Sequence, residues 1–117
     1  MSKTTILRFG PFDLDQKSGD LRKDGEVIKL QPQPFKVLAL LVRRSGEVVT
    51  RDEIQHQIWS EETFVDFDQG LNFCIRQIRG ALGDEAEGPQ YIETLPRRGY
   101  RFLVPVESTE GGSATPV

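Results

Sequence analysis

The order of apolar and polar positions divides the chain into a strand-like, a helical and a second strand-like region. In the first, residues 6–30, short apolar stretches alternate with turn residues, and Asp24-Gly25 separates the last two stretches. Asp-Gly favours a tight hairpin turn because both residues tolerate positive φ angles. The pattern predicts an N-terminal antiparallel sheet of three or four strands.

The helical region opens with a segment that is apolar over most of its circumference. Pro34 can occupy the first helical position because its missing N–H would have no partner there. Residues 35–42 are mostly apolar, which is typical of a central core helix. Two arginines, Arg43 and Arg44, fall in the last turn and Gly46 follows, so we expect the helix to end there.

A second helix has the clearest local start signal in the chain. Thr50 and Glu53 have the spacing of a capping box, so the helix should begin at Arg51 and end near residue 60. Residues 60–68 mix acidic with aromatic side chains and have no clear period. They predict a loop anchored by Phe64 or Phe67.

A third helix is expected from Gln69 to Leu82, with Asp66 or Asp68 as N-cap and Gly83 as its end. Its core-facing stripe consists of Leu71, Ile75, Ile78 and Leu82. The opposite face has no acidic side chain and presents Gln69, Phe73, Arg76, Gln77 and Gly80, with Asn72 and Arg79 on its flanks.

These residue types suit DNA. Arginine pairs with guanine or phosphate oxygens, asparagine and glutamine pair with adenine, and Phe73 could contact a thymine methyl group. The wheel fits a second interpretation equally well, in which Phe73 packs under a loop and the polar side chains only keep the helix in solution.

The second strand-like region carries a basic turn. Residues 91–95 and 100–104 have strand character, and residues 96–99 between them include Arg97 and Arg98. A basic hairpin tip suits a phosphate backbone or a narrow minor groove. Two arginines also occur commonly in solvated turns, so the turn on its own favours an ordinary solvated turn over a DNA contact.

The order of the elements is more informative than any one of them. A capped helix, a loop, a second helix with a polar face and a basic hairpin follow one another as in a winged helix-turn-helix. In that layout the second helix of the pair enters the major groove and the hairpin reaches the adjacent backbone. The pattern therefore favours DNA binding.

Composition limits this interpretation without removing it. The 117 residues include 15 Lys and Arg against 18 Asp and Glu, which gives a net charge of −3 and excludes a uniformly basic DNA-wrapping protein. A local basic face is still compatible, because acidic residues cluster at 61–68 and 84–87. The single cysteine cannot form an internal disulfide, so we expect a reducing, cytoplasmic setting. One cysteine and one histidine are too few for a zinc site, and we expect no metal and no cofactor.

A family resemblance rests on motifs that occur in order through residues 6–104. They are Phe9-Gly10-Pro11-Phe12-Asp13-Leu14, Gly46-Glu47-Val48-Val49, Arg51-Asp52-Glu53-Ile54, Val65-Asp66-Phe67-Asp68, Leu71-Asn72, Ile75-Arg76-Gln77-Ile78-Arg79, Ala81-Leu82-Gly83-Asp84, and Ile92-Glu93-Thr94-Leu95-Pro96-Arg97-Arg98-Gly99-Tyr100-Arg101-Phe102. The chain resembles the OmpR/PhoB-type DNA-binding domain of phosphorelay response regulators and of ToxR/CadC-like one-component regulators.

The resemblance implies an α+β fold, a winged helix-turn-helix with an N-terminal antiparallel β-sheet, a three-helix core and a C-terminal β-hairpin wing. It implies sequence-specific binding of double-stranded DNA for transcription regulation, with helix 69–82 in the major groove and wing 96–99 on the backbone or in the minor groove. The implied DNA contacts are Gln69, Asn72, Phe73, Arg76, Gln77, Arg79, Arg97 and Arg98. The sequence departs from more basic members of the family at Phe73, Cys74 and Gln77.

Further partners follow from the same resemblance. The loop 60–68 corresponds to a segment that touches RNA polymerase in some members, and a second copy can bind on tandem DNA repeats. We expect residues 1–5 to be a tail, residues 6–106 the DNA-binding domain, and residues 107–117 a flexible tail or linker. Two features of the family, a receiver domain before residue 1 and a membrane span after residue 104, are not found in this sequence. Because its end is rich in Gly, Ser, Thr and Pro like a linker, we expect the chain to be the N-terminal domain of a longer one-component regulator, cut in the linker.

Two other function classes compete with this one. An enzyme would need partners for His56 or Cys74, and no nucleophile, base or metal-ligand spacing is evident; Cys74 fits a small packing residue better than a redox thiol. A winged helix used only for protein contacts, as an adaptor, is the stronger competitor because of the acidic loop and net charge.

Overall fold

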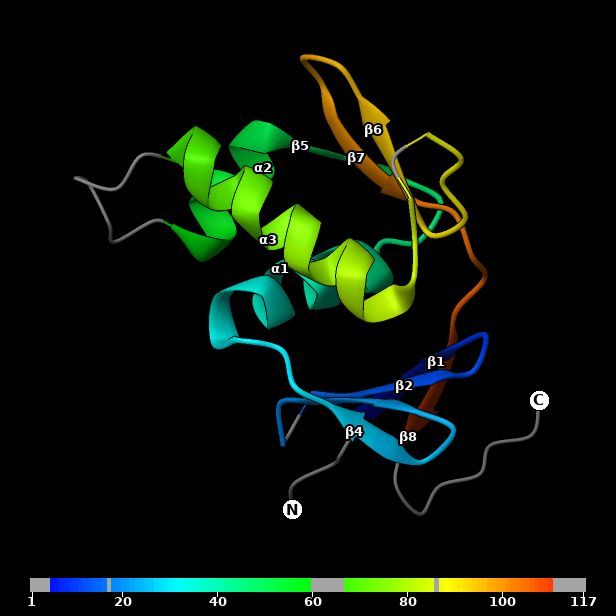
Figure 1. The fold of residues 1–117 in the computed structure, drawn as a ribbon. Coiled ribbons are helices and arrows are strands. Elements are labelled where there is room, and N and C mark those ends of the chain that lie inside the picture. Colours follow the sequence, from blue (N-terminus) through cyan, green and yellow to red (C-terminus); the bar gives the residue numbers. More distant parts are fainter. Residues whose placement is uncertain (1–4, 17, 60–66, 86, 111–117) are drawn as a thin grey trace.

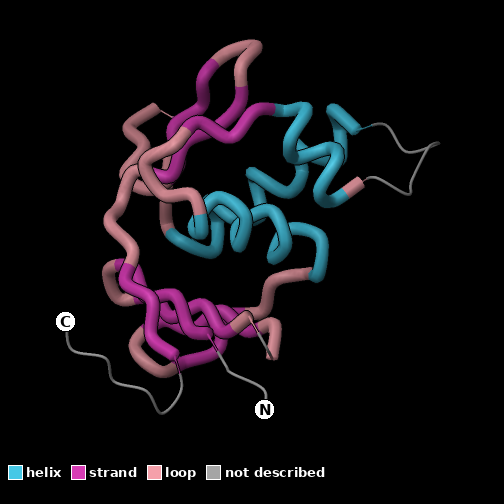
Figure 2. Tube along the Cα trace, turned by 180° about the vertical axis from the view of Figure 1, so that it is seen from behind, coloured by secondary structure: helices cyan, strands magenta, loops and turns pink. Residues whose placement is uncertain are grey.

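The computed structural model describes residues 5–16, 18–59, 67–85 and 87–110 of the chain. Three helices lie between two antiparallel sheets, as Figures 1 and 2 show from opposite sides. The N-terminal elements are β1 (Thr5–Phe9), β2 (Phe12–Asp15), β3 (Asp20–Lys23), β4 (Glu26–Ile28) and α1 (Pro32–Arg43). They are followed by β5 (Val48–Thr50), α2 (Arg51–Ile58), α3 (Phe67–Leu82), β6 (Ile92–Leu95), β7 (Gly99–Phe102) and β8 (Glu107–Glu110).

Residues 5–28 form four strands of the N-terminal sheet, the upper number of the three or four that the pattern predicts, and a fifth strand comes from the C-terminal end. The order of the sheet is β4-β3-β2-β1-β8, and every neighbouring pair is antiparallel. Asp24 and Gly25 connect β3 and β4 with φ angles of 51° and 88°, the paired positive values of a primed hairpin turn. The Asp-Gly signal is confirmed.

The fifth strand, β8, corrects the expected start of the tail at residue 107. It pairs with β1 so that Arg8 lies opposite Glu107 and Leu7 opposite Ser108. Strand pairing uses backbone N–H and C=O groups, so a polar segment with little apolar content can still join an open sheet edge. Residues 111–117 of the expected tail lie outside the described residues.

The C-terminal sheet has the order β5-β7-β6, with β6 and β7 forming the predicted hairpin. The sequence did not predict β5, because three residues are too few to show a periodic pattern. Thr50 of β5 lies opposite Gly99 of β7. A Cβ atom at Gly99 would lie only 2.0 Å from the carbonyl oxygen of Val49, so glycine is required where the wing meets this strand.

The helices begin close to the predicted positions. α1 starts at Pro32, two residues before the expected Pro34, because both prolines fit into its first turn. The capping box at the start of α2 is confirmed, since the Thr50 hydroxyl accepts from the Glu53 N–H at 3.1 Å and Glu53 accepts from the Thr50 N–H at 3.0 Å.

The predicted start of α3 is wrong by two residues. The helix already includes Phe67, and Asp68 lies in its first turn instead of at the N-cap. The ring of Phe67 packs edge-on against Trp59, the residue that follows α2, at a centroid distance of 5.2 Å. The alternative cap Asp66, the alternative anchor Phe64 and most of the expected loop 60–68 lie outside the described residues.

One core lies between the two sheets. The predicted stripe of α3 is buried, together with Cys74, Trp59 and the apolar side of α1. Phe9 of β1 contacts Phe102 of β7 edge-on at 5.0 Å, and Phe12 contacts Tyr91 at 5.6 Å. These aromatic contacts join the N-terminal sheet to the base of the wing.

Candidate nucleic-acid interface

The outer face of α3 is accessible to solvent along its length. After the exposed Asp68 in the first turn, its exposed side chains are Gln69, Asn72, Phe73, Arg76 and Gln77. Phe73 has 43% of its surface exposed, which does not fit the alternative in which it packs under a loop. Among the described residues Arg76 forms no ion pair, so its guanidinium is available to an external anion. The structure thus brings these five predicted contact residues onto one surface.

Arg79, the sixth predicted contact on this helix, lies differently. Its Nη2 atom donates to the carbonyl oxygen of Ile92 at 3.1 Å and to the hydroxyl of Thr94 at 2.8 Å, both on β6. Its Nε atom is buried and has no hydrogen-bond partner in the described part of the chain. Arg79 is therefore directed at the wing, and a cavity of about 620 Å³ opens beside it between α3 and β6.

Asp84 holds the start of the wing, a role that sequence reasoning missed because it counted Asp84 only among the acidic residues of the loop after α3. Only 8% of its surface is exposed. Its carboxylate accepts from the backbone N–H groups of Gln90, Tyr91 and Ile92 at 2.7, 3.3 and 3.1 Å. The sequence signal is weak: an aspartate directly after Gly83, the glycine that follows the last residue of α3.

The wing tip is a tight turn with an uncommon backbone conformation. The N–H of Arg98 donates to the carbonyl of Leu95 at 2.9 Å, and Arg97 has a φ of 65°. Proline at the second position and a positive φ at the third are features of a type II turn, although glycine or asparagine is usual at the third. Both arginine side chains are exposed, as predicted.

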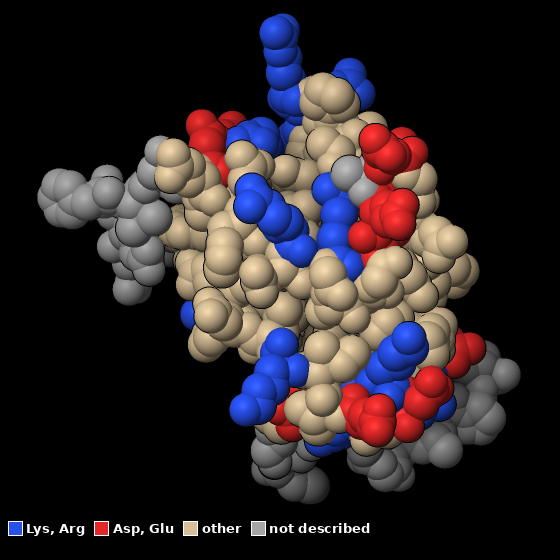
Figure 3. Space-filling view, in the orientation of Figure 1, with Lys and Arg blue, Asp and Glu red and all other residues tan. Residues whose placement is uncertain are grey.

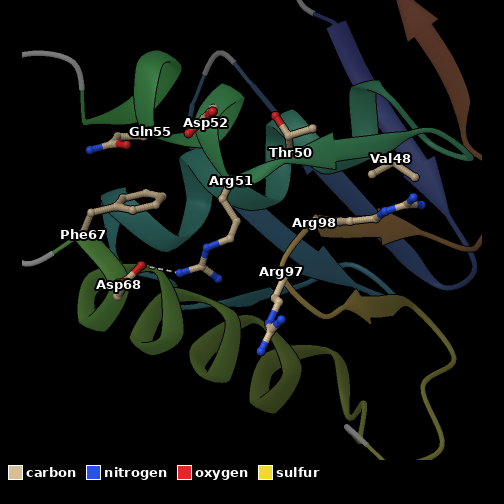
Figure 4. Close-up of a pocket in the computed structure, with 9 residues that line it drawn as sticks. All are labelled: Val48, Thr50, Arg51, Asp52, Gln55, Phe67, Asp68, Arg97 and Arg98. Carbon is tan, nitrogen blue, oxygen red and sulfur yellow. Dashed lines mark hydrogen bonds and ion pairs between the residues drawn. The ribbon is translucent and has the colours of Figure 1, made fainter.

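A hollow of about 660 Å³ lies where the wing tip meets the starts of α2 and α3. Figure 4 shows the side chains of Arg51 and Arg97 pointing toward α3, while Arg98 extends along β5 beside Val48. Arg51 forms an ion pair with Asp68, and its guanidinium lies 5.8 Å from the centre of the Phe67 ring. The backbone N–H of Arg51 donates to the backbone carbonyl of Arg98 at 3.1 Å, and this hydrogen bond connects the wing tip to the start of α2.

Arg51 was not among the predicted contact residues. Its position after a capping threonine indicates a helix start, and only the folded chain places it beside the wing. Figure 3 shows basic side chains over the wing and across the α3 side of the molecule, acidic side chains beside the wing, and side chains of both signs over the N-terminal sheet. This is the local basic face that a net charge of −3 leaves possible.

Comparison with known proteins identifies this arrangement. The family described as "Transcriptional regulatory protein, C terminal" matches residues 25–102. The chain belongs to this family. It is a DNA-binding domain of the type found in transcriptional regulators. This family is not a class of enzymes. The OmpR/PhoB-type resemblance and the winged-helix fold are confirmed.

The domain is similar in sequence to a transcriptional activator and in structure to a response regulator. It is 34% identical over 110 residues to the cholera toxin transcriptional activator of Vibrio cholerae, a match that covers 92% of this chain and 37% of that protein. The chain thus spans about a third of the length of this relative. The OmpR/PhoB homologue DrrB of Thermotoga maritima superposes with a TM-score of 0.73 at 30% identity, over 84% of this chain and 44% of DrrB.

A second solved structure includes DNA. The RstA DNA-binding domain of Klebsiella pneumoniae, in complex with the RstA box, superposes with a TM-score of 0.72 at 26% identity, over 84% of this chain and 96% of that domain. The same fold therefore occurs in a domain whose structure was determined on its DNA site.

The residues weighed for catalysis have structural roles in this regulatory domain. Cys74 is buried, and burial raises the pKa of its thiol to about 11, so it is protonated at neutral pH. The preference for a packing residue is confirmed. Nδ1 of His56 lies 2.9 Å from the carbonyl oxygen of Asp52 one helical turn away. The described residues contain no group of three or more potential metal ligands and no helix long and apolar enough to span a membrane.

Proposed function

We propose that the domain binds double-stranded DNA in a sequence-specific manner, with α3 in the major groove and the wing tip on the backbone or in the minor groove. The observation that carries the proposal is the exposed face of α3, which presents amide and guanidinium groups and has no acidic side chain from Gln69 to Leu82. Such groups form paired hydrogen bonds with base edges.

The geometry of the face supports separate roles for its residues. Arg76 suits guanine, Asn72 and Gln77 suit adenine, and exposed Phe73 suits a thymine methyl group. Gln69 lies in the first turns of the helix and suits a phosphate or base contact. Arg79 contributes by holding the wing beside the helix, because its Nη2 is already bonded to β6.

Arg97 and Arg98 are proposed to contact phosphates, and a salt titration tests this role. Each phosphate neutralised on duplex DNA contributes about −0.9 to the slope of log affinity against log salt. We expect a steep slope for random duplex, reduced by roughly 1 to 2 in the double variant Arg97→Ala with Arg98→Ala. Arg8→Ala is the control for loss of an arginine away from the wing: Arg8 lies exposed in β1 of the N-terminal sheet, paired with Asp13, and its removal should leave the slope unchanged.

The protein-adaptor alternative predicts a different result. An adaptor without phosphate contacts would show no duplex binding, or binding without the salt dependence, and the wing variant would then match the Arg8→Ala control. Most of the acidic loop 61–68 on which this alternative rests lies outside the described residues, so the salt titration decides between the two.

Finer partner assignments are proposed from the family resemblance. We infer that a second copy binds beside the first on tandem repeats, that segment 60–68 contacts RNA polymerase, and that the domain works in the cytoplasm, where DNA is accessible. A duplex with two adjacent sites should bind two copies more tightly than two separated sites. Deleting residues 61–65 should lower transcription activation without lowering DNA affinity.

A further inference from the structure

We propose that Asp68 competes with DNA phosphate for Arg51: the hollow at the wing tip accepts a backbone phosphate, and in the free protein the Asp68 carboxylate occupies the guanidinium that this phosphate would bind. The inference rests on the proposed DNA-binding function and adds a contact residue, Arg51, and a residue that opposes binding, Asp68.

The first step is the placement of three arginines around one hollow. Arg51 comes from the start of α2, and Arg97 and Arg98 come from the wing tip. The backbone hydrogen bond from Arg51 to Arg98 keeps these two segments together. Figure 4 shows Arg51 and Arg97 pointing into the same space beside α3. A phosphate that lies between α3 and the wing would therefore meet both guanidinium groups.

The second step is the weak hold of Asp68 on Arg51. The Asp68 side chain is 72% exposed and that of Arg51 is 32% exposed, so water and salt screen their attraction. Exposed ion pairs of this kind contribute little to stability, and the carboxylate can turn into water at small cost. Arginine also binds phosphate bidentately, with a geometry at least as favourable as that of a carboxylate.

The third step is the fixed position of the guanidinium. The ring of Phe67, the first residue of α3, lies 5.8 Å from the guanidinium carbon, within the range of a cation–π contact that favours this position. When Asp68 turns away, Arg51 remains directed at the hollow. Exchange of the carboxylate for a phosphate then needs only one side chain to rotate.

A matched control lies on the rim of the same hollow. Asp52 carries the same charge one residue after Arg51, and in Figure 4 its carboxylate points away from the Arg51 guanidinium. Asp52→Asn and Asp68→Asn therefore remove equal charge near the proposed phosphate. Only the second frees Arg51.

The experiment measures the affinity of the full chain for a random duplex across a salt series. We expect Asp68→Asn to tighten binding at low salt by about two- to fivefold. This is the change in affinity expected when binding no longer has to break an exposed ion pair. Asp52→Asn should give a smaller gain. Arg51→Gln should make the salt slope less steep by about 0.9, whereas Arg51→Lys keeps the charge and should keep the slope.

A double variant tests the coupling itself. In the Arg51→Gln background, Asp68→Asn should give no more gain than Asp52→Asn does. The inference is overturned if Asp68→Asn and Asp52→Asn tighten binding equally in the otherwise unchanged protein, or if Arg51→Gln leaves the slope as it was. If the unchanged protein does not bind duplex at all, the proposed function fails as well; normal binding with no effect at Arg51 rejects this inference alone.

Discussion

The Nη2 atom of Arg79 lies 2.8 Å from the hydroxyl oxygen of Thr94, and this contact joins the proposed recognition helix to the first strand of the wing. Asp84 strengthens the same junction from the loop after α3, where it accepts three backbone N–H groups. A helix and a wing that bind one duplex must keep a fixed separation. Here side-chain hydrogen bonds set that separation, and they involve residues that looked like DNA contacts or loop acids.

Loss of the Arg79 contact should cost stability as well as DNA affinity. Arg79→Met keeps the aliphatic stem and removes both hydrogen bonds to β6, so urea unfolding should show a loss of about 1 to 2 kcal/mol. Thr94→Val removes one acceptor and should cost less. Unchanged stability in Arg79→Met, with a loss of DNA binding alone, would return Arg79 to the direct contacts.

Removal of the Asp84 carboxylate should destabilise the domain more strongly. Asp84→Ala leaves backbone N–H groups without their acceptor, and the cost should be about 2 to 4 kcal/mol in a denaturant titration. Its neighbour Glu85 is exposed, so Glu85→Ala should change stability by less than about 0.5 kcal/mol. Equal effects of the two substitutions would mean that the Asp84 hydrogen bonds contribute nothing.

The positive φ of Arg97 allows the effect of its charge on DNA binding to be separated from its effect on stability. Glycine relieves a left-handed conformation that costs other residues about 1 to 2 kcal/mol, and part of this gain is offset by glycine's greater freedom in the unfolded chain. Arg97→Gly should thus melt at the same or a higher temperature than the unchanged protein while binding random duplex more weakly.

Arg98→Gly is the paired control for that substitution. It removes the same charge one residue away, at a position whose φ is not positive, so it should lower stability by about 0.5 to 1 kcal/mol. If Arg97→Gly were the less stable of the two, the strain assigned to Arg97 would be wrong.

The start of α2 should make stability depend on acid pH. Hydrogen bonding from the Thr50 N–H, followed by the side-chain contact with Arg44, lowers the pKa of Glu53. A carboxyl with a lowered folded-state pKa stabilises the fold above its unfolded pKa, and this contribution is lost as pH falls through the folded value. Glu53→Gln keeps the capping geometry and cannot titrate there, so it should lose less stability than the unchanged protein between pH 6 and about pH 3. Parallel acid profiles would contradict this role.

How far the sequence predicted the structure depended on the range of the interactions. The Thr50–Glu53 capping box and the stripe of Leu71, Ile75 and Ile78 were predicted correctly because both arise within one or two helical turns. The hairpin turn at Asp24-Gly25 is equally local.

The features that were missed depend on contacts between distant segments. Strand β8 pairs with β1 across the length of the chain, and the three-residue β5 exists because it lies against β7. Asp84 and Arg79 acquire their partners only after the wing folds onto α3. The same holds for Arg51, whose neighbours at the wing tip follow it by more than 40 residues.

The most direct test of sequence-specific DNA binding is selection of bound duplexes from a random pool, carried out in parallel with the unchanged protein and Arg76→Ala. We expect the unchanged protein to enrich a short motif. Arg76→Ala should lose preference at one position of it, by roughly 1 to 3 kcal/mol, with a smaller loss on random duplex. No enrichment by the unchanged protein, or the same motif with equal preference from both proteins, would contradict the assignment of α3 as the base-reading element.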